Sequence, residues 1–265
     1  MKINRDIYIN LSKIISDNFF LKNNIYKKKF KYNIPYIISI FGSVSSGKST
    51  TAKILKYYLT KQLKNFNIQL VSLDGFLYCN KILIKKGIIK KKGFPESYNI
   101  EFLKKFLINF KLGKSYNLIP NYSHLFYDII KSKKIILKSD ILILEGLNFF
   151  QKNKKKYYCL NNNYSYNLID LNVYINAKES FIEEWYINRF LGFIRESKSK
   201  PYSYFSRYLN ITEEKAIEKA SKIWKNVNKI NLIKNILPTK KYAHLIIEKN
   251  RNHSSEIFYN KKIFY

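Results

Sequence analysis

The residues with the clearest chemical potential form one short run, GSVSSGKS, at positions 42–49. The run fits the pattern G-x-x-x-x-G-K-[ST] of a loop that cradles phosphate groups. Two glycines allow a tight bend that brings backbone N–H groups close to phosphate oxygens. The lysine places a charge on the terminal phosphates, and the last hydroxyl can bind Mg²⁺. The pattern predicts a nucleotide-phosphate site made of Gly42, Ser43, Val44, Ser45, Ser46, Gly47, Lys48 and Ser49, with Ser49 at the metal.

Two carboxylates follow apolar runs that are typical of buried strands. Asp74 comes after residues 68–73, which we expect to form a central strand, and Glu145 closes the run 141–144. Ligands of open α/β sheets bind at the carboxyl ends of the strands. There Asp74 could take a proton from an acceptor hydroxyl or bind Mg²⁺, and Glu145 could orient Mg²⁺ or its waters. The alternatives are an ordinary Asp-Gly turn for Asp74 and a solvent-facing carboxylate for Glu145.

An aromatic cluster and an arginine complete the candidate residues. Tyr122, His124 and Tyr127 lie within one six-residue stretch, and three rings with polar tips suit the grip of a small polar molecule. A structural role is the alternative for His124. Arg189 is notable because the chain strongly prefers lysine, and a guanidinium can bind phosphate oxygens bidentately and stabilise a transferring phosphoryl group. The alternative for Arg189 is a salt bridge on a helix surface.

A strand must lead into the phosphate loop and a helix must follow it. Residues 36–41 are a short Ile-rich run that predicts a buried parallel strand. After the loop, apolar residues recur at spacings of three and four, which predicts a helix carrying Ala52, Leu55, Leu59 and Leu63. The amino terminus of this helix adds its dipole to the phosphate site.

Elements of the same two kinds alternate along the remaining chain. We expect strands at 68–73, 140–146, 168–175 and 243–247, and helices at 100–110, 178–193 and from the cap Thr212 onward. This alternation indicates an α/β fold of the P-loop NTPase type, a mainly parallel sheet with helices on both faces and a helical lid. Residues 1–33 predict one helix and a connector, an N-terminal helical segment before a larger unit at 34–265.

The composition is strongly basic, with 49 Lys plus Arg against 18 Asp plus Glu and a net charge of +31. Such a charge is typical of nucleic-acid binding. However, the abundant residue types all have codons rich in A and T, and the lysines are scattered rather than gathered in one stripe. This pattern favours compositional drift over a selected polyanion-binding surface. Either origin produces a positive field that favours anionic ligands such as ATP.

The cysteines and the hydropathy of the chain indicate in which cellular compartment we expect the protein. Cys79 and Cys159 form no C-x-x-C pair, which excludes a thiolate zinc site and a disulfide framework and fits a reducing cytosol. No apolar stretch reaches 18 residues, and the first residues do not have the pattern of a secretory signal. We therefore expect a cytoplasmic protein without a membrane partner.

Seven runs of the sequence resemble, in the same order, the bacterial type I pantothenate kinases. They are GSVSSGKSTTAKIL, LDGFLYCN, KKKGFPESYN, YSHLFYD, DILILEGLN, WYINRF and NILPT. The resemblance covers residues from about 34 to 250 and is weakest over 152–167. The phosphate loop is shared by many nucleotide enzymes, whereas GFPESY together with YSHLFYD and NILPT is much more selective. The family is similar in fold to uridine kinases and phosphoribulokinases.

The resemblance implies transfer of the γ-phosphoryl of ATP, with Mg²⁺, to the primary hydroxyl of pantothenate, the first step of coenzyme A biosynthesis. It implies that Asp74 is the base and that Lys48 and Arg189 balance the charge of the transferring group. It implies a P-loop kinase domain over 34–265, a homodimer, and feedback inhibition by coenzyme A at the nucleotide site. The implied pantothenate pocket comprises Tyr122, His124, Tyr127, Tyr186 and Asn228.

Three departures from the family concern regulation more than chemistry. The N-terminal segment is shorter than is usual, and Lys53 and Lys240 stand where the family commonly has Arg. The residue at the position of Lys53 is linked in the family to coenzyme A binding. Lysine keeps the charge but loses the planar fork, so we expect weaker feedback inhibition.

Two other functions remain open at this point. One is a kinase of the same fold that acts on a nucleoside or a sugar. The other is a basic, non-catalytic P-loop protein on nucleic acid, whose binding would depend steeply on salt. We expect no nucleic-acid partner, because such a protein has no need of Tyr122, His124 and Tyr127 together.

Overall fold

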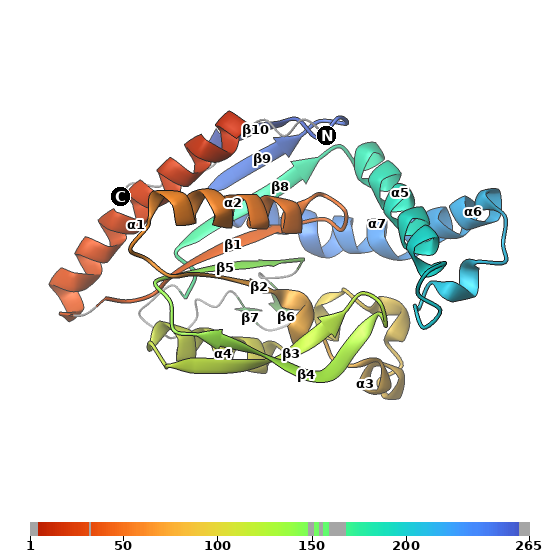
Figure 1. The fold of residues 1–265 in the computed structure, drawn as a ribbon, viewed down its shortest axis with the longest axis horizontal. Helices are drawn as coiled ribbons and strands as arrows, with labels where there is room; N and C mark the ends of the chain where they lie inside the picture. The colour runs from red at the N-terminus through yellow and green to blue at the C-terminus, as the bar shows by residue number, and fades with distance from the viewer. Residues whose placement is uncertain (1–4, 32, 148–150, 154–155, 159–167, 260–265) are drawn as a thin grey trace.

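A six-stranded sheet forms the centre of the molecule, with strand order β10-β9-β8-β1-β5-β2 (Figure 1). The computed structural model describes residues 5–31, 33–147, 151–153, 156–158 and 168–259. All the neighbouring strands of this sheet pair in parallel except β10, which is antiparallel to β9. The bounds are β1 Tyr36–Gly42, β2 Ile68–Ser72, β5 Ile141–Gly146, β8 Leu171–Ala177, β9 Leu245–Lys249 and β10 Ser255–Tyr259.

Helices cover both faces of the sheet, because the central strands are apolar on both sides. Ile38 and Ile40 of β1 pack into one core cluster with α1 and α2, whereas Ile37 and Phe41 pack into another with α4 and α5. A strand buried on both faces needs a continuous apolar run, which is why residues 36–41 do not alternate. The predicted α/β fold is confirmed. The helices are α1 Arg5–Phe30, α2 Lys48–Gln62, α3 Asn80–Lys85, α4 Ile100–Lys111, α5 Glu179–Ser197, α6 Glu213–Ile223 and α7 Lys229–Asn231.

The helix expected within residues 1–33 is α1, and it is part of the main core. Tyr8, Leu11, Ile15 and Phe19 are buried in the same cluster as the apolar face of α2. Figure 1 shows α1 crossing the sheet beside α2. The division of the chain at residue 33 stays a prediction, although both of its parts contribute to one core. None of the helices in the described ranges could cross a membrane, since none is both long and apolar enough.

Two features of the strands differ from the expectations. The strand before Asp74 was expected to be central, and this was wrong. This strand, β2, lies at one edge of the sheet, because β5 inserts between it and β1. The order of strands along the chain does not give their order in space. Two antiparallel pairs were not predicted from the sequence. One is a long hairpin of β3 (Tyr116–Ser123) and β4 (Asp128–Leu137), and the other is the short pair of β6 (Gln151–Asn153) and β7 (Lys156–Tyr158). The hairpin packs below β2 (Figure 1).

The expected helical lid is formed by α5 and α6, which extend beyond the sheet on one side (Figure 1). Phe190, Phe205 and Ala220 make a separate small core between these helices. Thr212 caps α6 as predicted, and its hydroxyl accepts a hydrogen bond from the backbone N–H of Lys215 at 3.4 Å. The lid therefore has a small apolar core of its own.

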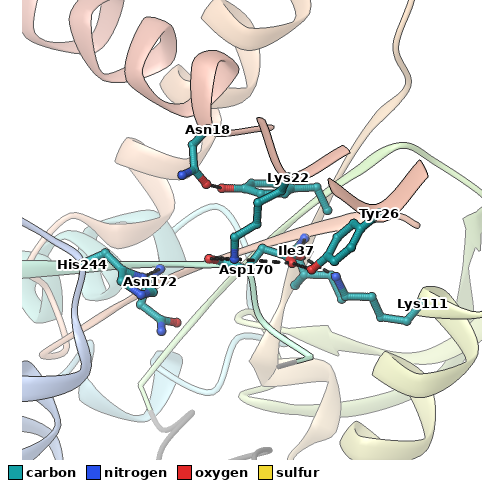
Figure 2. Close-up of polar contacts among 9 residues, drawn as sticks. Asn18, Lys22, Tyr26, Ile37, Lys111, Asp170, Asn172 and His244 are labelled. Atoms are coloured by element: carbon teal, nitrogen blue, oxygen red, sulfur yellow. Dashed lines mark hydrogen bonds and ion pairs between the residues drawn. The ribbon is translucent and has the colours of Figure 1, made fainter. Parts of the chain in front are cut away.

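A buried carboxylate fastens the opposite, amino-terminal edge of the sheet (Figure 2). The side chain of Asp170 has no exposed surface and forms an ion pair with Lys111 of α4. It accepts hydrogen bonds from the Tyr26 hydroxyl of α1 at 2.6 Å and the Ile37 N–H of β1 at 2.7 Å. Lys22 donates to the Asp170 carbonyl oxygen at 3.0 Å. One aspartate thus joins two helices, on opposite faces, to two strands.

Replacing Asp170 with Asn is expected to lower the free energy of unfolding by about 3 kcal/mol, because Lys111 is left buried without its counter-ion. Chemical denaturation at pH 7 measures this. Glu218→Gln is the control: it breaks the exposed ion pair with Lys222 on α6, so the free energy of unfolding should change much less than in Asp170→Asn. Equal, small effects of the two substitutions would contradict a fastening role for Asp170.

Candidate active site

Each glycine of the phosphate loop has a distinct geometric reason. Gly42 ends β1 with φ of 148°, and a Cβ there would lie only 2.4 Å from the carbonyl oxygen of Ile175 in β8. Gly47 has φ of 86°, in the left-handed region that favours glycine, and precedes the first turn of α2. The first glycine therefore permits close packing of two strands, and the second turns the chain into the helix.

Some buried polar groups of the phosphate loop form no hydrogen bond within the described part of the protein. Within the described chain, the buried side-chain hydroxyls of Ser43 and Ser45 have no hydrogen-bond partner. Lys48 is buried, and its Nζ donates to the Ser43 carbonyl oxygen at 2.6 Å. Unsatisfied buried polar groups are rare in folded proteins. Together with the amino terminus of α2, they fit the phosphate groups of a nucleotide.

A cavity of about 460 Å³ opens beside this loop, under the lid. Loop residues Val44, Lys48 and Ser49 reach it. Gly42, Ser43, Ser45, Ser46 and Gly47 do not line it. The other predicted residues that the structure brings together on its wall are Asp74, Tyr122, His124, Tyr127, Glu145, Tyr186, Arg189 and Asn228. Residues predicted from six separate stretches of sequence, the phosphate loop included, therefore share one cavity.

Asp74 lies in a short 3₁₀ turn, Leu73–Phe76, directly after β2. Its backbone N–H donates to the hydroxyl of Ser72 at 3.3 Å, which fixes the start of the turn. Burial raises the pKa of the Asp74 carboxyl above its ordinary value of 3.8, against the opposing charges of Lys48, Arg189 and Lys92. A carboxylate with a raised pKa among three cations is suited to accept a proton in the cavity.

Two carboxylates, Glu145 and Asp74, act on Lys48. Glu145 is the residue before the end of β5, and it pairs with Ile40 near the end of β1, the strand that leads into the loop. Burial lowers the pKa of Lys48 to about 8, while Glu145 and Asp74 oppose the shift. Among the described residues no group of three or more His, Cys, Asp or Glu side chains could hold a metal ion. Ser49 and Glu145 on the cavity wall offer oxygen ligands that could hold Mg²⁺, an ion that keeps several waters and takes other ligands from substrate phosphates.

The aromatic residues come from the turn of the β3–β4 hairpin. The rings of Tyr122 and His124 are 5.2 Å apart, and those of Tyr122 and Tyr127 are 6.3 Å apart. Tyr127 has φ of 52° and stacks on Tyr204 of the lid at 4.8 Å. Burial, and then the positive charge of Arg189, lower the pKa of His124. The imidazole is therefore neutral at physiological pH and can accept as well as donate a hydrogen bond.

The lid supplies the opposite wall. Tyr186 and Arg189 are three residues apart on α5 and so share one face. The guanidinium of Arg189 lies 5.1 Å from the centre of the Phe193 ring. Asn228 ends a π-helical turn, Trp224–Asn228, a distortion often found at functional sites. Burial raises the pKa of Tyr186 to about 12, although a hydrogen bond with the Asn228 side chain opposes the shift.

Several residues of the cavity wall were not predicted from the sequence, and the most notable of them is Lys92. The Nζ of Lys92 donates to the Asn80 side-chain oxygen at 2.8 Å and to the Tyr127 carbonyl oxygen, and lies 5.1 Å from the centre of the Tyr122 ring. Burial lowers the pKa of Lys92 to about 8. Its signal was its place just before Gly93 in KKKGFPESY, but one lysine does not stand out in a chain so rich in lysine.

Comparison with known proteins agrees with this geometry. The model of the phosphoribulokinase/uridine kinase family matches residues 37–190. Proteins named pantothenate kinase are similar over most of the chain. The protein of Histophilus somni strain 2336 is 44% identical over 95% of this chain and 80% of its own length. That of Hamiltonella defensa is 41% identical over 97% and 83%. That of Yersinia enterocolitica is 40% identical over 94% and 81%.

Solved structures support the same fold at much lower identity. D-glycerate 3-kinase from Cryptococcus neoformans superposes with a TM-score of 0.61 at 14% identity, covering 94% of this chain and 99% of its own. A likeness at that identity speaks for the fold alone, whereas the curated relatives are similar along nearly the whole chain. The chain therefore belongs to the phosphoribulokinase/uridine kinase family and, within it, to the pantothenate kinases.

Proposed function

We propose that the protein transfers the γ-phosphoryl group of ATP to the primary hydroxyl of pantothenate, producing 4′-phosphopantothenate and ADP. The observation that carries this proposal is one cavity in which a phosphate-loop lysine, a buried carboxylate and a cluster of polar aromatic side chains meet. The relatives named pantothenate kinase support the choice of acceptor. The reaction is the first step of coenzyme A biosynthesis.

The roles of the residues follow from their charges and positions. The loop N–H groups and Lys48 hold the nucleotide phosphates. Asp74 orients the pantothenate hydroxyl and takes its proton as the new O–P bond forms and the bond to ADP breaks. Arg189 balances charge on the transferring group. Mg²⁺, held by Ser49 and Glu145, would neutralise charge on the β- and γ-phosphates. The contribution of the protein is mostly placement and electrostatics.

A panel of acceptors tests the activity directly. Purified protein, ATP and Mg²⁺ are incubated separately with pantothenate, uridine, D-glycerate and a hexose, and the products are identified by mass. We expect phosphorylation of pantothenate alone. Faster phosphorylation of uridine or a sugar would favour another kinase of the same fold. A lack of any phosphorylated acceptor, together with steeply salt-dependent RNA or DNA binding, would favour the non-catalytic alternative.

Replacing His124 with Gln is expected to raise the KM for pantothenate at least tenfold and to change the KM for ATP less than twofold. The neutral imidazole lies at the turn of the hairpin beside Tyr122, among the polar aromatic side chains that we assign to pantothenate, so its hydrogen bonds should serve the acceptor. Steady-state kinetics with each substrate varied in turn measure both constants. Equal increases in both KM values would contradict this position of the acceptor.

We also propose a cytoplasmic homodimer that coenzyme A inhibits by competing with ATP. Lys53 lies exposed on α2, and its positive charge contributes to lowering the pKa of His124, a residue of the cavity wall. Lysine in place of the arginine common in the family favours weak inhibition. The molar mass in solution and a titration with coenzyme A at several ATP concentrations test the two parts.

A further inference from the structure

A second lysine lies close to the phosphate loop, outside the cavity. Lys249 ends β9, and its partner across the ladder is Ala177 at the end of β8, so it occupies the same sheet edge as the loop. Only 5% of its surface is exposed. A Cβ added to Gly47 would lie 3.6 Å from the Nζ of Lys249. Lys249 is not among the residues that line the cavity.

The contacts of this ammonium group are unusual for a buried charge. Its Nζ donates to the hydroxyl of Tyr8 on α1 at 3.2 Å, and that hydroxyl lies 3.4 Å from the Oγ1 of Thr51 on α2. In the described part of the chain no carboxylate forms an ion pair with Lys249. A buried ammonium group that donates to a phenol oxygen and, among the described residues, pairs with no carboxylate is costly for the fold.

The nearest place for a negative charge is the phosphate site itself. Gly47 immediately precedes α2, and the first backbone N–H groups of that helix face the phosphates of a bound nucleotide. The ammonium group of Lys249, beside Gly47, is therefore only a short distance from the site of those phosphates. Within a protein, where the effective dielectric constant is well below that of water, a charge acts strongly across such a separation.

We infer that Lys249 is a second cation of the phosphate site and that the phosphates of the bound nucleotide are its counter-ion. The inference rests on the proposed function, since it requires ATP at the loop. Lys249 acts through the loop without touching the reacting atoms, so it is a positioning residue. It donates a hydrogen bond to the Tyr8 hydroxyl and adds positive potential beside Gly47 and the N–H groups, while Lys48 binds from the cavity side.

The charge of Lys249 should have opposite effects on two quantities, the stability of the ligand-free protein and the affinity for nucleotide. Without nucleotide, the uncompensated ammonium group of Lys249 destabilises the protein. With nucleotide, the same group strengthens binding. Removing the charge should therefore weaken the binding of phosphates without lowering the stability of the ligand-free protein. A lysine that only supports the fold would lower stability when it is removed.

The test compares Lys249→Met with Lys64→Met, which removes the same charge from an exposed residue beyond α2. Calorimetry measures the Kd of ADP and of adenosine, and thermal unfolding measures the ligand-free protein. For Lys249→Met we expect ADP to bind at least tenfold more weakly, adenosine to bind within twofold of the parent, and the ligand-free Tm to stay equal or rise. Lys64→Met should change none of these values.

Other outcomes separate the two proposals. Unchanged ADP affinity in Lys249→Met, or an equal loss for adenosine and ADP, overturns the role of Lys249. A parent protein that binds neither ATP nor ADP overturns the proposed function instead. If Lys249→Met does not fold, Lys249→Gln keeps a polar group against Tyr8 and gives the same comparison. Lys249→Arg keeps the charge and should retain ADP affinity within threefold.

Discussion

Replacing Lys48 with Ala is expected to lower kcat by about 10³-fold or more and to weaken ATP binding. The ammonium group is the only side-chain cation of the loop that reaches the cavity, and it carries charge to the oxygens that become more negative as the phosphoryl group transfers. Steady-state kinetics and calorimetric titration with ATP measure the two effects. Pantothenate affinity, which depends on the hairpin and the lid, should change little.

The stability of this variant provides the control. Burial lowers the pKa of Lys48 to about 8, whereas the unfolded chain holds the same proton with a pKa near 10.4. The buried ammonium therefore destabilises the ligand-free protein below pH 8, and this cost disappears as the pH rises toward 10.4. Lys48→Ala should unfold at the same or a higher temperature at pH 7. An active variant contradicts the loop assignment, and an unfolded one contradicts the electrostatic account.

The parallel core of the fold was predictable from sequence because its signals are local. Residues 141–144 are an uninterrupted apolar run, and residues 36–41 are apolar except for the buried Ser39, as expected of strands buried on both faces. The apolar spacing after Lys48 is that of a helix, and Thr212 offers a hydroxyl where a helix begins. The observed boundaries differ by a few residues: β8 begins at Leu171 and β9 at Leu245.

The hairpin was missed because its pattern is mixed. β3 contains Pro120, and the pairing register shifts between Pro120 and Asn121, so the alternation of apolar residues is broken. β4 contains several exposed lysines among its isoleucines. The hairpin is nevertheless what carries Tyr122, His124 and Tyr127 to the cavity, so the residues of the pocket were identified without the element that positions them.

The site was only partly predictable, for a related reason. Motifs name residues whose chemistry is visible in the sequence, such as the carboxylate of Asp74 before Gly75. Lys92 and Lys249 act through their surroundings, because each becomes notable only when burial and neighbours are known. Because the chain has 49 lysines and arginines, these two lysines do not stand out in the sequence.

Cys79 is a free thiol next to Asn80 in the chain, and Cys159 lies outside the described residues.

The raised pKa of Asp74 links its chemistry to stability. In the unfolded chain the carboxyl has its ordinary pKa of 3.8, and in the folded protein burial raises it. Ionised Asp74 therefore destabilises the folded state. The free energy of unfolding that this carboxyl contributes falls as the pH rises from about 3.8 through the raised pKa of the folded state. An uncharged isostere at this position removes the cost at neutral pH. Loss of activity in such a variant is then not a consequence of unfolding.

Replacing Asp74 with Asn is accordingly expected to lower kcat by about 10²–10⁴-fold while the Kd of ATP stays within threefold of the parent. The amide keeps the shape of the side chain but cannot take the proton of the acceptor hydroxyl. The acid limb of the pH profile of kcat/KM should disappear with it, because the group that must be ionised is gone. Asp74→Asn should unfold at the same or a higher temperature at pH 7. Turnover within threefold of the parent, with the acid limb intact, would remove Asp74 from the reaction and leave Glu145 as the remaining carboxylate on the described part of the cavity wall.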